Sequence, residues 1–134
     1  MIEINNLTTN PVDEEFLKGI VKKVLEGENK EGAGLSIALV GQGRIRELNK
    51  KYRGKNRATD VLAFPGDGLG EIIICLREVK KNAKRYRSNS EKELARVLIH
   101  GILHLLGYDH EKSEQAAEKM REKEGYYFVR SLKT

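Results

Sequence analysis

Apolar residues follow two periodicities along the chain, and these divide it into strands and helices. Residues 1–6 alternate apolar and polar positions, and residues 34–40 form a run of apolar, branched residues bounded by glycines. Both patterns are typical of β-strands. Residues 60–64 and 70–76 are similar and are separated by a turn containing Pro65 and Gly66. Four strands are therefore predicted.

Elsewhere the apolar positions recur every three to four residues, the spacing of one face of an α-helix. The segment Ser88-Asn89-Ser90 is a strong start signal, because such side chains accept hydrogen bonds from free N–H groups at a helix start. Helices are predicted over residues 12–27, 45–52, 76–86, from Ser90 onward and over 112–132. The order β-α-β-α-β-β-α-α-α predicts an α+β fold, a small mixed sheet of about four strands with about five helices.

The bulk properties of the chain indicate one soluble domain. Its 134 residues, without repeat, low-complexity tract or linker, fit a single domain spanning residues 1–134. No run approaches the ~18 apolar residues of a membrane helix, and the first residues lack the charged start of a signal peptide. The single cysteine, Cys75, lies in an apolar run and is expected to be a buried hydrophobic residue. We therefore expect a cytoplasmic protein with no membrane partner.

Positive charge is concentrated in the middle of the chain. The net charge is +5, and residues 44–57 hold seven basic residues and one acid, whereas residues 77–87 hold six and one. Such a balance favours polyanionic partners. Five of these basic residues share one face of a predicted helix, which is either a surface that binds RNA phosphates or an ordinary solvated face. They are Arg77, Lys80, Lys81, Lys84 and Arg85.

The chain's only three histidines fall within residues 100–110, and they predict a metal site. His100 and His104 are four apart on a helix and project from the same face. Gly107 can end that helix in the left-handed conformation, so that the chain turns back and presents His110. Three imidazoles leave one tetrahedral position of zinc open, the arrangement of a catalytic site. We therefore expect one zinc ion per chain, held by a metzincin-like site on a helix and the following turn.

The histidine spacing makes a zinc peptidase one candidate function. H-x3-H-x5-H is also the ligand spacing of metzincin proteases, H-E-x-x-H-x-x-G-x-x-H, but Gly101 stands where those enzymes have their glutamate base. A metzincin-type zinc peptidase is therefore disfavoured.

Three stretches of the chain match the sequence pattern of one known protein family. Residues 100–110 match every fixed position of the signature H-G-x-L-H-L-x-G-Y-D-H. Residues 52–65 are similar to Y-R-G-K-x-x-x-T-D-V-L-S-F-P, with Ala63 for serine, and residues 69–74 are similar to L-G-D-I-x-I, with Glu71 for aspartate. Both departures are mild, and the chain resembles the YbeY family of rRNA-maturation endoribonucleases.

The resemblance implies a zinc-dependent, single-strand-specific endoribonuclease. Two alternatives stay open beside it. One is the zinc peptidase, and the other is a non-catalytic, ribosome-associated binding protein with structural zinc, in which Cys75 or a distant carboxylate completes a closed site.

Family roles include 16S rRNA 3′-end maturation and ribosome quality control, so the implied partners are single-stranded RNA, ribosomal RNA and the small ribosomal subunit. Zinc would lie on His100, His104 and His110, with Arg53 in the active cleft. From its position alone, Arg53, at a predicted helix end before Gly54, is equally well a surface residue.

Several residues have two predicted roles. Asp109 either orients an imidazole or a water molecule, or forms a turn. Asp60 either lines the cleft or shapes a loop together with Thr59. The tyrosines either stack bases or pack in the protein, which is the more common role. They are Tyr86, Tyr126 and Tyr127.

Overall fold

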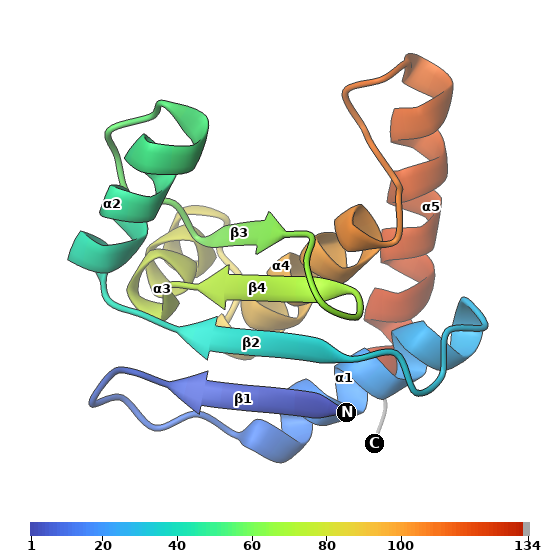
Figure 1. The fold of residues 1–134 in the computed structure, drawn as a ribbon, viewed down its shortest axis with the longest axis horizontal. Helices are drawn as coiled ribbons and strands as arrows, with labels where there is room; N and C mark the ends of the chain where they lie inside the picture. Colours follow the sequence, from blue (N-terminus) through green and yellow to red (C-terminus); the bar gives the residue numbers. More distant parts are fainter. Residues whose placement is uncertain (133–134) are drawn as a thin grey trace.

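A four-stranded mixed sheet forms the centre of the fold (Figure 1). The computed structural model describes residues 1–132. The strand order is β1 (Ile2–Asn6), β2 (Leu35–Leu39), β4 (Gly70–Ile74) and β3 (Val61–Phe64). Strands β1, β2 and β4 are parallel, and β3 runs antiparallel to β4 at the edge. The predicted α+β class with a mixed sheet is confirmed.

Five helices surround the sheet in the predicted order, and their bounds lie within three residues of those expected. They are α1 (Glu14–Gly27), α2 (Gln42–Arg53), α3 (Leu76–Arg85), α4 (Ser90–Leu105) and α5 (Glu114–Ser131). Within residues 1–132, no helix combines the length and the apolar character needed to cross a membrane.

The two faces of the sheet bury separate apolar clusters. Ile72 and Ile74 of β4 point into the larger cluster, which α1, α4 and α5 cover. Ile73 points to the opposite face, beneath α2, where Cys75 is fully buried, as predicted. Alternate residues of one strand thus serve both clusters, as the two-residue repeat of a strand requires.

Helix α4 lies against the sheet and ends at the candidate site. It begins at Asn89, whose side chain accepts a hydrogen bond from the Lys92 N–H at 2.8 Å. Gly101 is buried, and a Cβ there would lie 3.3 Å from Cδ1 of Ile72. A glycine at this position therefore allows close packing of α4 on β4.

Candidate active site

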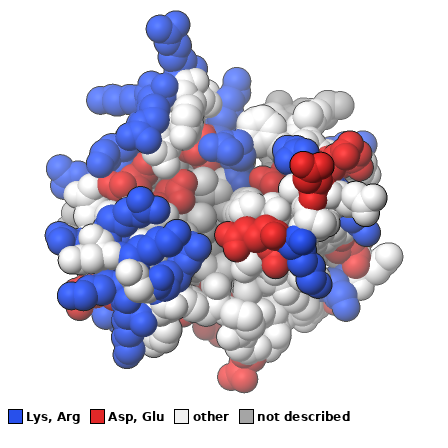
Figure 2. Space-filling model, turned by 90° about the horizontal axis from the view of Figure 1, so that it is seen from above, with Lys and Arg blue, Asp and Glu red and all other residues white. Residues whose placement is uncertain are grey.

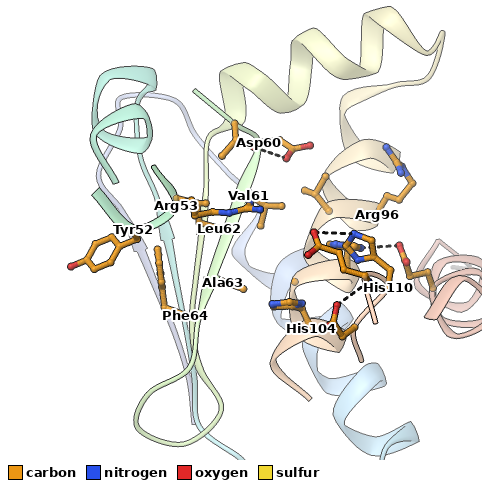
Figure 3. A pocket seen from close by; sticks show the side chains of 17 residues that line it. Tyr52, Arg53, Asp60, Val61, Leu62, Ala63, Phe64, Arg96, His104 and His110 are labelled. Atoms are coloured by element: carbon orange, nitrogen blue, oxygen red, sulfur yellow. Dashed lines mark hydrogen bonds and ion pairs between the residues drawn. The ribbon is translucent and has the colours of Figure 1, made fainter. Parts of the chain in front are cut away.

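All three histidines line one cavity, which lies between β3 and α4 (Figure 3). Its volume is about 680 Å³, and the end of α2, the turn after α4 and one residue of α5 complete its walls. His100 and His104 come from α4, and His110 comes from the turn. Gly107 has a φ of 104°, so the chain reverses there and brings the His110 ring to 5.5 Å from the His100 ring, between centroids.

The residues present fit a zinc ion in their chemistry. The Nδ1 atom of His100 lies 3.3 Å from Oε2 of Glu124 on α5. A carboxylate accepts the Nδ1 proton and leaves the Nε2 lone pair for a metal, which is the usual arrangement around histidine ligands. In the rotamers that residues 1–132 adopt, no three His, Cys, Asp or Glu side chains converge closely enough to hold one ion. Coordination of one ion by all three histidines would therefore need side-chain rotation, and the His104 and His110 side chains are exposed.

Arg53 faces the histidines across the cavity. It is the last residue of α2, which ends because Gly54 adopts the left-handed conformation at a φ of 69°. Figure 3 shows its side chain reaching across β3 towards α4. A guanidinium opposite three imidazoles can bind a phosphate between them, because its planar donors match phosphate oxygens.

Both candidate aspartates line the cavity. Oδ2 of Asp60 accepts a hydrogen bond from Asn82 of α3 at 3.1 Å, so this carboxylate also ties the cavity wall to α3. Oδ1 of Asp109 accepts the N–H of Glu111 at 2.9 Å. This bond is the turn-forming role that the sequence left open for Asp109, and it leaves Oδ2 to face other groups.

Comparison with known proteins assigns the family. The sequence model described as endoribonuclease YbeY matches residues 3–131. The chain belongs to the YbeY family. It is 42% identical to the endoribonuclease YbeY of Persephonella marina over 118 residues, which cover 81% of this chain and 77% of that one. It is 38% identical to the Petrotoga mobilis endoribonuclease YbeY, with 97% of this chain and 94% of that one covered.

A solved structure supports the assignment. The solution structure of the Thermotoga maritima protein TM1509 superposes with a TM-score of 0.73 at 36% identity, covering 98% of this chain and 89% of that one. The predicted family and the predicted class of enzyme, an endoribonuclease, are therefore confirmed.

Five basic residues on one face of α3, which we call the basic stripe, lie outside the cavity of this YbeY-family protein. They are Arg77, Lys80, Lys81, Lys84 and Arg85. All five residues are exposed on α3, and Lys81 forms an ion pair with Glu78 at 3.4 Å. Figure 2 shows Lys and Arg gathered over the side of the molecule that carries α2 and α3. Of the three tyrosines, Tyr127 is buried in the core, whereas Tyr86 and Tyr126 are exposed.

Two cavity residues have no signal in the sequence, Glu124 and Arg96. Arg96 lies one helical turn before His100 and binds the buried Glu93 through two hydrogen bonds, of 2.6 and 3.2 Å. The hydrogen bonds that Arg96 donates to the Glu93 carboxylate raise the pKa of Arg96 above its ordinary value, so the guanidinium stays fully charged. Glu93 lies in the first turn of α4, where an acidic side chain also favours the helix start. Its two hydrogen bonds hold the Arg96 side chain at the cavity wall.

A second group of polar contacts lies beneath the histidine turn. The carboxylate of Glu28, just after α1, accepts a hydrogen bond of 2.6 Å from the hydroxyl of Tyr108 in the turn. It also accepts a hydrogen bond from the hydroxyl of Tyr127 and pairs with Lys123 at 3.2 Å, both on α5. One carboxylate thus connects α1, the histidine turn and α5.

The contacts of Glu28 predict that the folded protein loses stability in acid. Burial alone would raise the pKa of Glu28, but hydrogen bonds from Tyr108 and Tyr127 and the charge of Lys123 outweigh it, so the pKa lies below its ordinary value. Burial and the neighbouring carboxylate raise the pKa of Tyr108 to about 12. Because a lowered pKa adds stability above the unfolded-state value of about 4.3, that stability is lost as the pH falls through the folded-state pKa.

This effect can be measured by urea unfolding of metal-free protein and its Glu28→Gln variant from about pH 7 to about pH 3. The unchanged protein is expected to be more stable at neutral pH, and the difference should shrink below about pH 4.3. A difference that stays constant over this range would show that ionisation of Glu28 does not stabilise the fold.

Proposed function

We propose that this YbeY-family protein is a zinc-dependent endoribonuclease that cleaves single-stranded RNA. The observation that carries the proposal is that three histidines and Arg53 line one cavity from opposite sides. The names of its relatives supply the substrate class, RNA. On the basis of the family resemblance, we propose that it acts on the small ribosomal subunit, in 16S rRNA 3′-end maturation and in ribosome quality control.

In this proposal five of the cavity residues have assigned tasks. His100, His104 and His110 hold the zinc ion, which supplies Lewis-acid stabilisation of charge on a phosphoryl oxygen. Arg53 donates to the same phosphate from the other side and stabilises the charge that develops there. Glu124 keeps the His100 proton on Nδ1, so that Nε2 stays a donor atom for the metal.

Residue 101 cannot accept the proton that the attacking group gives up during cleavage. Gly101 carries no side chain, and its α-carbon faces Ile72 of β4. Bulk water, a phosphate of the substrate and Asp109 remain as acceptors. Because Oδ1 of Asp109 is engaged by the Glu111 N–H, a role for Asp109 would fall to Oδ2.

The packing of Gly101 disfavours the peptidase alternative. The glutamate base of a metzincin would stand at this position, where even a Cβ lies 3.3 Å from Ile72. The structural-zinc alternative also loses one of its ligands, since Cys75 is buried in the cluster on the opposite face of the sheet. The carboxylates that line the cavity remain as candidates for a fourth ligand: Asp60, Asp109, Glu111 and Glu124.

Replacing Glu124 with glutamine is expected to weaken zinc affinity by about 10- to 100-fold, the usual effect of losing a carboxylate behind a histidine ligand. Zinc affinity is measured by competition with a chromophoric chelator. Glu122→Gln, an exposed change on the same helix, is the matched control and should have no effect. Equal affinities in all three proteins would remove Glu124 from the zinc site.

The basic stripe is proposed to guide RNA by binding its phosphates. Replacing Lys80 and Lys84 with glutamine should weaken binding of single-stranded RNA and lower the salt slope of log K by about 0.7 for each phosphate that the variant no longer neutralises. The matched control changes Lys18 and Lys22 of α1, which have the same i, i+4 spacing. If both double variants bind like the unchanged protein, the stripe is ordinary surface.

A further inference from the structure

The turn that carries His110 is held from outside the zinc site. Residues 107–110 begin at Gly107, where a left-handed backbone ends α4, and the N–H of Tyr108 donates to the carbonyl of Leu103 at 3.1 Å. The Tyr108 side chain then extends away from the cavity to Glu28, which lies 80 positions earlier in the chain. The turn is therefore fixed through its backbone on one side and through a side-chain hydroxyl on the other.

The bond between Tyr108 and Glu28 has the features of a strong positioning contact. It is 2.6 Å long and joins a hydroxyl to a charged carboxylate, which makes it stronger than a hydrogen bond between neutral groups. The Glu28 side chain is only 12% exposed, so water competes little for its oxygens. Lys123 and Tyr127 occupy the other carboxylate oxygen and prevent Glu28 from turning away.

The same carboxylate also touches the helix that supports His100. Lys123 and Tyr127 flank Glu124 on α5, and Glu124 contacts Nδ1 of His100. Two of the three histidines therefore depend on elements that meet at Glu28. His110 depends on it more directly, since Tyr108 is two residues away in a four-residue turn.

We propose that Glu28 is a positioning residue for the zinc site: through Tyr108 it fixes residues 107–110 and holds His110 beside His100. It contacts neither substrate nor metal. The expected effect of Glu28 on metal affinity depends on the proposed zinc site. Its expected effect on the turn does not depend on that proposal. The competing explanation is that Glu28 only docks α5 on α1 through Lys123 and Tyr127.

The two tyrosines provide a matched pair of variants. Tyr108→Phe and Tyr127→Phe each remove one hydroxyl bonded to the same carboxylate, and each keeps the ring and its packing. Only Tyr108 lies in the histidine turn. A role in general stability would be lost in both variants, whereas a role in placing His110 would be lost in the first alone.

The first measurement is amide hydrogen exchange of metal-free protein. Tyr108→Phe should speed exchange of the Gly107 and Tyr108 amides, which donate to the carbonyls of His104 and Leu103, and Tyr127→Phe should leave both unchanged. A Glu28→Ala variant should reproduce the faster exchange, and adding Tyr108→Phe to it should cause no further change, since both act through one bond. Unchanged exchange in Tyr108→Phe, or equal increases in both tyrosine variants, would overturn the proposal.

The second measurement is zinc affinity of the same proteins by chelator competition. Tyr108→Phe and Glu28→Ala should weaken affinity about 10-fold, the lower end of the range for residues behind metal ligands. Tyr127→Phe should change it less than about twofold. Equal losses in the two tyrosine variants would contradict positioning by Glu28. If the unchanged protein binds no zinc, the proposed function fails, and the exchange experiment still decides whether Glu28 fixes the turn.

Discussion

Arg53→Glu is expected to abolish RNA cleavage and to leave zinc affinity unchanged. The guanidinium lies across the cavity from the histidines, so its loss removes charge stabilisation from the reacting phosphate without touching a metal ligand. Loss of one such donor costs about 100- to 1000-fold in kcat, and a carboxylate in its place adds repulsion. Cleavage of a labelled single-stranded RNA measures the first effect, and chelator competition measures the second.

The same helix offers a control for the change of charge. Lys50→Glu makes the same reversal in the last turn of α2, at an exposed residue that does not line the cavity. Lys50→Glu therefore has the same effect on the helix dipole as Arg53→Glu, and it should leave most of the cleavage activity. Arg53→Lys should be intermediate, because it keeps the charge and loses the planar fork. If Arg53→Glu retains full activity, Arg53 has no part in the mechanism.

His104→Ala is expected to lose both zinc affinity and cleavage. Changes behind a metal ligand cost about 10- to 100-fold in affinity, and loss of a ligand itself should cost more. Because the His104 side chain is exposed, the stability of the metal-free protein should change by less than about 0.5 kcal/mol. Zinc affinity and urea unfolding, measured on the same preparation, separate these effects. An unchanged zinc affinity would show that the metal, if bound, lies elsewhere.

Local patterns are enough to predict the elements of the fold. Apolar spacing predicts the order of strands and helices because each pattern reflects burial of one face of a single element. The pattern places the start of α2 three residues late, at Ile45 instead of Gln42. Gly41 precedes the helix without a side-chain cap, so the sequence holds no start signal there.

The candidate site is predictable only where its residues are close in sequence. The three histidines share one helix and one turn, so their spacing alone places them together. Glu124 meets His100 from 24 positions away, and Glu28 meets Tyr108 from 80 positions away. Such contacts depend on how α1 and α5 pack against α4, and no local pattern encodes that packing. The adjacent Tyr126 and Tyr127 differ in burial for the same reason: helix packing turns only Tyr127 towards the core.

Cleavage of a labelled single-stranded ribosomal RNA fragment by zinc-loaded protein tests the central claim most directly. A chelated sample and the His104→Ala variant, purified identically, are measured beside it. The proposed function predicts cutting by the zinc-loaded protein alone. Equal cutting in all three samples would point to a contaminating ribonuclease, and the absence of cutting by the zinc-loaded protein would contradict an intrinsic zinc-dependent nuclease activity.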